Sequence, residues 1–138
     1  MLALVAVIAF GGYSLLKGNR TNPSNNNSNP ESPATATEPT EVIYTQTGYT
    51  PETLRVKAGT TVIFKNASPR SMWTASALHP THRLYDDTAL NEHCPDVSGV
   101  AFDQCGADEE YSFTFNKTGN WKYHNHLYPE HTGAIIVE

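Results

Sequence analysis

Residues 54–66 read LRVKAGTTVIFKN and indicate the fold class, because apolar and polar side chains alternate on both sides of a turn. Leu54 and Val56 alternate with basic residues before the turn at 58–60. Val62 and Phe64 continue the alternation beyond it. A period of two is typical of strands that bury one face. The stretch therefore predicts two successive β-strands separated by a tight turn.

The same alternation returns near the C-terminus, along residues 111–123, with a turn at 117–120. A fully apolar run, AIIV at 134–137, predicts a last, buried strand. Several short strands with regular turn signals predict an all-β fold, an antiparallel Greek-key β-sandwich over residues 41–138. No helix is predicted there. Residues 71–110 form a long irregular segment, and loops of that length usually carry function.

The first 40 residues differ from the rest. Residues 2–16 are apolar, and Lys17 and Arg20 follow. A helix of this length spans roughly 23 Å, less than the ~30 Å hydrocarbon core, and no basic residue precedes it. We interpret residues 1–18 as a short membrane anchor, with a cleaved signal segment as the alternative. Of the 22 residues at 19–40, 17 are Asn, Pro, Ser or Thr, a composition that predicts a disordered linker.

Charge and motifs exclude several functions. Residues 41–138 hold seven basic and twelve acidic side chains, a net charge of 7 − 12 = −5. An acidic domain without a basic stripe is not expected to bind nucleic acid. The chain has no G-x-G-x-x-G, P-loop or G-x-S-x-G motif. A nucleotide-dependent enzyme or a serine hydrolase is therefore not expected.

All six histidines fall between His79 and His131. His124 and His126 are two residues apart, so on a strand they face the same side. His79 and His82 flank Pro80, in a turn that can bring two rings together. Imidazole is the commonest protein ligand for metals and suits copper and zinc. Surface histidines and a purely structural His-Pro turn remain the alternatives.

Three segments resemble the cupredoxins, the plastocyanin, amicyanin and azurin group of small copper β-sandwiches. They are residues 49–66 (YTPETLRVKAGTTVIFKN), 119–124 (GNWKYH) and 133–137 (GAIIV). The resemblance covers about residues 41–138 and implies an upstream His ligand, then Cys, His and Met before the last strand. Here the position of the Cys holds Asn125, that of the second His holds Tyr128, and that of the Met holds His131. Because a blue copper centre depends on its thiolate, none is expected.

Residues 121–126 (WKYHNH) also resemble the Trp-Tyr-His-x-His segment of multicopper oxidases, whose histidines point away from the barrel interior. Strand alternation agrees, because His124 and His126 lie opposite Tyr123 and Asn125. The chain is too short for a full oxidase. We expect a thiolate-free copper site made of His79, His82, His124 and His126, with His131 as a possible fifth ligand.

Cys94 and Cys105 are expected to form a disulfide that closes the long loop, as suits an oxidising compartment. The alternative is that Cys94 delivers a thiolate to copper.

His93 lies in the acidic loop and is expected to be solvated. Residues 86–110 hold eight acidic and no basic residues. That segment is either a solvated loop or a docking patch for a basic redox partner.

The expected protein is a copper-binding, cupredoxin-like domain held at the extracytoplasmic side of the cell membrane by a single N-terminal anchor. It would serve electron transfer or copper capture and delivery. The alternatives are a small copper enzyme, such as a superoxide dismutase or a reductase, and a metal-free structural sandwich. Electron carriers and copper carriers need the same ligands, so the residues leave that choice open.

Overall fold

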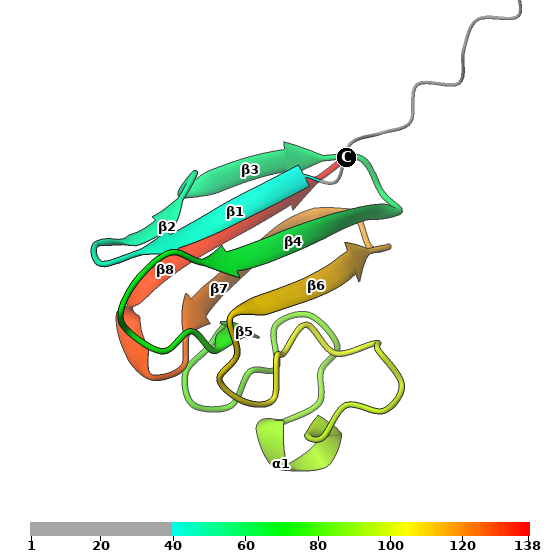
Figure 1. Ribbon diagram of the computed structural model, residues 1–138. Coiled ribbons are helices and arrows are strands. Elements are labelled where there is room, and N and C mark those ends of the chain that lie inside the picture. Colours follow the sequence, from blue (N-terminus) through cyan, green and yellow to red (C-terminus); the bar gives the residue numbers. More distant parts are fainter. Residues whose placement is uncertain (1–39) are drawn as a thin grey trace, which may run out of the picture. The chain divides into compact units, whose positions relative to one another are not determined.

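A computed structural model describes residues 40–138, which form a β-sandwich of two sheets (Figure 1). The predicted anchor at 1–18 and nearly all of the predicted linker at 19–40 lie outside the described residues, so both stay predictions. Among residues 40–138, no helix has the length and apolar character needed to cross a membrane.

Each sheet has four strands. The first has the order β2-β1-β4-β6, with bounds β1 (Thr40–Thr45), β2 (Gly48–Thr50), β4 (Thr60–Asn66) and β6 (Glu110–Phe115). The second has the order β3-β8-β7-β5, with bounds β3 (Thr53–Val56), β5 (Thr74–Ser76), β7 (Gly119–Asn125) and β8 (Tyr128–Val137). The two-sheet β-sandwich is thereby confirmed.

Two details correct the sequence prediction. The pairs β1/β4 and β3/β8 are parallel, so both sheets are mixed rather than antiparallel. The reason is the path of the chain, which crosses to the second sheet between β2 and β3 and returns for β4. The long segment between β5 and β6 also contains a one-turn helix, α1 (Leu90–His93). Figure 1 shows this segment gathered at the end of the sandwich away from the C-terminus.

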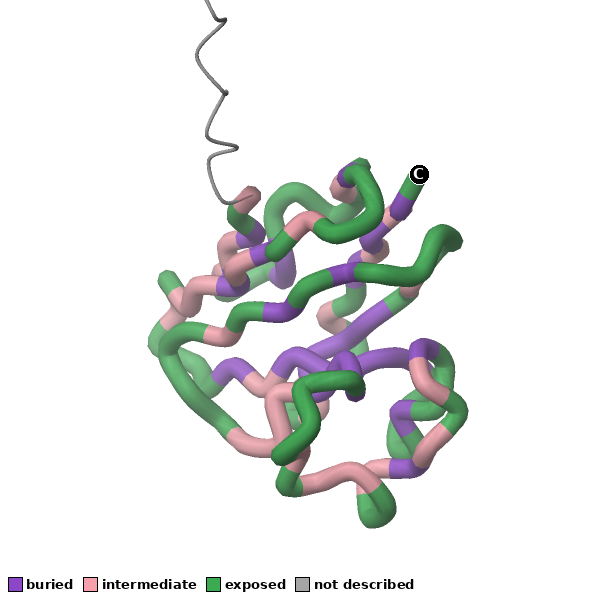
Figure 2. Tube along the Cα trace, turned by 90° about the vertical axis from the view of Figure 1, so that its right-hand side faces the viewer, coloured by how far each residue is buried: buried purple, intermediate pink, exposed green. Residues whose placement is uncertain are grey.

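The core follows the alternation in the sequence. Val62 and Phe64 on β4 are fully buried, while Thr61 before them is exposed and Ile63 between them is half-buried. Figure 2 shows the same alternation of buried and exposed residues along the strands. Burying side chains of this size contributes about 1.5–3 kcal/mol each. The core cluster is rich in aromatic rings, namely Tyr44, Tyr49, Phe64, Tyr85, Phe102, Phe113, Phe115 and Tyr123.

Tyr123 packs over a residue that has to be glycine. Tyr123 on β7 pairs with Gly133 on β8, and the ring lies directly over the glycine Cα. A Cβ added at Gly133 would lie 2.4 Å from both Cζ and Oη of Tyr123. Because Tyr123 is 1% exposed and surrounded by core rings, it has no room to move. Tyr123, the residue before His124 on β7, is thereby fixed in the core.

Replacing Gly133 with alanine is expected to lower the free energy of unfolding by about 1–3 kcal/mol, the usual cost of overpacking a core. Gly106→Ala is the matched control, because a Cβ there meets nothing within 4 Å. Urea denaturation of both variants measures the effect. Equal stability of the two would show that the contact between Tyr123 and Gly133 is not tight.

Candidate metal centre

Four imidazole rings meet where the loop after β5 covers the end of β7. The centroid of the His82 ring lies 5.0 Å from that of the His124 ring and 4.9 Å from that of the His126 ring. The ring of His79 lies 5.0 Å from His126 and 5.4 Å from His124. We call these four residues the histidine cluster. Three of them, His82, His124 and His126, bring their ligand nitrogens within 4.8 Å of one another.

Local backbone structure places these rings. His124 lies on β7 opposite Ala75 of β5, and His126 follows the end of that strand. The backbone N–H of His126 donates to the carbonyl of Trp73 at 2.7 Å. His82 closes a turn in which its N–H donates to the carbonyl of Leu78 at 2.9 Å. Its φ is 60°, a left-handed conformation that costs a residue with a Cβ about 1 kcal/mol or more.

Asn125 fastens the turn after β7, which carries His126, to the segment before β5. Its Oδ1 accepts from the backbone N–H of Trp73 at 3.2 Å and of Leu127 at 3.0 Å. Its Nδ2 donates to the carbonyl of Ser71 at 3.0 Å. The side chain is fully buried. An asparagine therefore makes structural hydrogen bonds at the position where the cupredoxin pattern has its cysteine.

Asp103 orients His82. Its Oδ2 contacts His82 Nδ1, and both side chains are fully buried. Burial opposes the charged carboxylate, but hydrogen bonds from His82, Trp73, the Cys105 N–H and His93 outweigh it and hold the pKa of Asp103 at about 2. An ionised carboxylate only accepts, so the hydrogen of His82 lies on Nδ1, and Nε2 is left as an acceptor that faces His126 Nδ1 at 2.9 Å. Asp103 was not among the predicted site residues.

His124 is the ring of the cluster whose buried nitrogen has no partner. It is 4% exposed, and its Nε2 is buried without a hydrogen-bond partner. Burial, followed by the neighbouring His82, His79 and His126, lowers the pKa of His124 to about 4. Burial, followed by His82 and His79, also lowers the pKa of His126. The rings of His124 and His126 are therefore neutral near pH 7, as metal ligands have to be.

Lowering the pH from 7 to 4 is expected to destabilise the metal-free protein through His124. Its pKa falls from 6.5 to about 4 on folding, so between these values the unfolded chain binds more protons than the folded one. Stability present above pH 6.5 is then lost as the pH falls toward 4, by on the order of 2–3 kcal/mol. Urea unfolding at both pH values measures this loss. A His124→Gln variant with the same pH slope as the original chain would contradict it.

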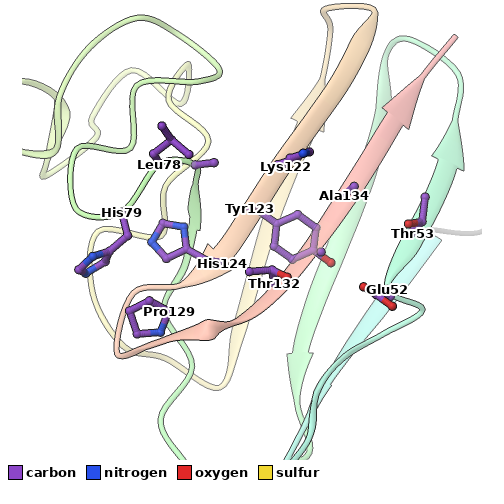
Figure 3. Close-up of a pocket in the computed structure, with 12 residues that line it drawn as sticks. Glu52, Thr53, Leu78, His79, Lys122, Tyr123, His124, Pro129, Thr132 and Ala134 are labelled. Carbon is purple, nitrogen blue, oxygen red and sulfur yellow. The ribbon is translucent and has the colours of Figure 1, made fainter.

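A pocket gives the cluster access to the outside. Its volume is about 460 Å³, and His79 and His124 line one end of it (Figure 3). His79 is exposed, whereas His126 is half-buried and the other two rings are buried. Lys122, Thr132 and Ala134 line the far side along β7 and β8. As the alternation predicts, Lys122 and His124 lie on the same face of β7, but the loop at 77–82 covers His124.

His131, predicted as a possible fifth ligand, contacts residues outside the histidine cluster. Its Nδ1 is 2.8 Å from the hydroxyl of Tyr44, and its ring stacks on Tyr128 with centroids 5.9 Å apart. The structure therefore does not bring His131 together with the histidine cluster.

The predicted disulfide between Cys94 and Cys105 is confirmed, with Cα atoms 5.3 Å apart. No cysteine in the described residues is free, so neither thiolate reaches the histidine cluster in this form. His93, expected to be solvated, is instead nearly buried, with 6% of its side chain exposed. Of the eight acidic residues in the loop, five make side-chain hydrogen bonds inside it, namely Asp86, Glu92, Asp96, Asp103 and Asp108.

Solved structures confirm the cupredoxin resemblance. An oxidised amicyanin variant has a TM-score of 0.54 at 20% identity, covering 78% of this chain and 89% of the other. The reduced Cu(I) form of another amicyanin variant has a TM-score of 0.52 at 23% identity, covering 72% and 81%. A purple cupredoxin from Nitrosopumilus maritimus has a TM-score of 0.49 at 18% identity, covering 72% and 99%.

Neither a scan against protein-family models nor a search of curated proteins gave a match. At these levels of identity the likeness to the amicyanins shows the fold alone. Residues 40–138 are therefore a cupredoxin-like domain. The comparison with the amicyanins does not extend to the histidine cluster, whose geometry comes from this chain alone.

Proposed function

We propose that this domain binds one copper ion through the histidine cluster, with nitrogen ligands only. The observation that carries the proposal is the buried, unpartnered Nε2 of His124 beside two further imidazoles. A buried polar atom without a partner costs about 1–3 kcal/mol, and bonding to a metal ion removes that cost. Copper is the metal named for a solved amicyanin of the same fold.

A set of three or four imidazole nitrogens favours copper(II) in a tetragonal site. His82 Nε2 and His126 Nδ1 are 2.9 Å apart and are joined by a hydrogen bond. An ion bound by both nitrogens would replace the present hydrogen bond between them.

A blue copper centre does not fit these residues. Asn125 replaces the cysteine, and the chain's two cysteines form the disulfide. The proposed centre is therefore free of thiolate and pale. When bound, copper would supply one-electron chemistry; this chain's residues would orient the ligands and shield the ion from water.

Electron transfer is the role that these contacts favour. Asp103 fixes the ring of His82, and Asn125 fixes the loop of His126, so the ligands need little rearrangement between two oxidation states. Copper capture and delivery is the second candidate, favoured by the exposed ring of His79 at the pocket. A basic redox partner would meet the acidic side chains left exposed at Asp87, Asp108, Glu109 and Glu110.

The cellular setting is part of the same proposal. Residues 1–18 would anchor the chain in the cell membrane and residues 19–40 would hold the domain away from it, on the extracytoplasmic side. The apolar run at 2–16 and the disulfide between Cys94 and Cys105 support this placement, because disulfides persist in oxidising compartments.

Copper(II) titration of the full chain tests the proposal. One equivalent is expected to bind and to raise the melting temperature, because a ligand stabilises the state that binds it. His124→Asn is expected to weaken binding by more than about 100-fold, since it removes a ligand outright. His131→Asn is the control and should bind as the original chain does. Equal weakening in both variants, or no stoichiometric binding at all, would contradict the proposal.

A second experiment separates the two roles. The copper-loaded chain is reduced with ascorbate in the presence of a copper(I) chelator. An electron carrier is expected to keep its ion and to return to the copper(II) spectrum on oxidation. A copper carrier is expected to lose the ion to the chelator within the same time.

A further inference from the structure

A second group of potential ligands lies on the far side of Asp103 from the histidine cluster. His93 ends α1, Cys94 follows it, and Cys105 comes two residues after Asp103. Potential ligand atoms of these four residues lie within 4.8 Å of one another. In the oxidised form two of those atoms are the disulfide sulfurs, which are poor ligands. The group has the composition of a metal site whose two thiolates are held as a disulfide.

Two contacts hold the ring of His93 at this group. Its Nδ1 lies 2.8 Å from the hydroxyl of Thr88, which itself donates to Asp86 Oδ2 at 2.5 Å. Its Nε2 donates to Asp103 Oδ2 at 3.1 Å. A metal ion bound by Nε2 would replace that hydrogen bond and would lie beside the Asp103 carboxylate.

An entry route reaches the same group. A pocket of about 340 Å³ is lined by residues that include Asp96, Asp103 and Cys105. No basic side chain lines it, and of its two acidic side chains that of Asp96 is partly exposed, whereas the carboxylate of Asp103 is fully buried. It is separate from the pocket at His79 and His124, with which it shares no lining residue. A cation can therefore approach Cys105 without passing through the histidine cluster.

We propose that reduction of the disulfide converts Cys94, Cys105 and His93 into a second metal site for a thiolate-preferring ion such as Zn²⁺ or Cd²⁺. Two thiolates and one imidazole are a ligand set typical of zinc, and water or Asp103 would complete four-coordination. The site does not depend on copper binding at the histidine cluster. Because Asp103 also contacts His82, the two sites would share one carboxylate.

The chemistry balances with a thiol or phosphine reductant. Two small thiols become one small disulfide while the protein disulfide takes up two electrons and two protons and becomes two thiols. A phosphine supplies the same two electrons by becoming its oxide, with water providing the oxygen atom and the two protons. The metal ion then displaces both protons and forms two metal–sulfur bonds. Oxidation by any disulfide of suitable potential reverses the sequence and releases the ion.

The test uses the full chain, freed of metal, with and without reduction by a water-soluble phosphine, and Cd²⁺ as the probe. The ultraviolet charge-transfer band of cadmium–thiolate bonds is followed during titration. One equivalent is expected in the reduced protein and no band in the oxidised protein. His93→Asn is expected to weaken binding by about 10-fold or more while both thiols remain, and His131→Asn should change nothing. Equal affinity of the His93 variant would overturn the proposal, because any dithiol would then suffice.

Circular dichroism of the reduced, cadmium-loaded protein decides whether the folded domain provides the site. A strand signal equal to that of the oxidised protein supports it, whereas binding only with loss of that signal overturns it. Cys94→Ser with Cys105→Ser should abolish the band. Copper titration of that double variant separates the proposals, because copper should still bind whether or not the second site exists.

Discussion

Asp103→Asn is expected to weaken copper(II) binding about 10- to 100-fold, the usual loss when the partner that orients a metal-bound histidine is removed. The amide oxygen of the asparagine can take the place of Asp103 Oδ1 and accept from Trp73 Nε1 and from the backbone N–H of Cys105. Its amide nitrogen would then face His82 Nδ1, where the carboxylate accepted. The neutral ring would have to move its hydrogen to Nε2, which is the nitrogen that copper needs.

Copper competition against a chelator of known affinity measures this effect, with the melting temperature of each metal-free protein as a check on folding. Asp87→Asn is the matched control, because Asp87 is exposed in the same segment. Asparagine also tolerates its φ of 67°. Unchanged copper affinity in a folded Asp103→Asn protein would show that Asp103 is structural and does not position His82.

Asn125→Ala is expected to destabilise the protein by about 3 kcal/mol or more. The change removes three hydrogen bonds in a fully buried position and leaves two N–H groups and one carbonyl to find other partners. Each buried group left unpaired costs about 1–3 kcal/mol, less where water reaches it. The loop that carries His126 also loses its attachment, so copper affinity should fall along with stability.

Urea unfolding and copper titration of Asn125→Ala measure both effects. Asn120→Ala is the control, since Asn120 is exposed on the same strand and should change stability by less than about 0.5 kcal/mol. An Asn125→Ala protein as stable as the control would contradict the role of Asn125 in joining the loops.

The sequence predicted the fold well because alternation is local. The runs at 54–66 and 111–123 each show which face of a strand is buried, and the sandwich follows from that pattern. The parallel pairs β1/β4 and β3/β8 could not be predicted, because strand direction depends on where the chain changes sheets. The helix α1 is one turn long and leaves no periodic signal.

The site was predictable only in part. The spacing of His124 and His126, and the turn at His79 and His82, pointed to two pairs of rings, and the structure brings these four together. Asp103 carried no signal, since it is one of eight acidic residues in its loop and meets His82 across 21 positions. Burial and pairing at that separation are properties of the folded chain.

The central claim is a copper ion held by imidazoles without a thiolate. Electron paramagnetic resonance and visible absorption of the full chain loaded with one equivalent of copper(II) test it most directly. We expect a tetragonal signal split by several nitrogen nuclei, together with weak absorption. An intense visible charge-transfer band, the mark of a copper–thiolate bond, would contradict it, because a cysteine would then have to be a ligand.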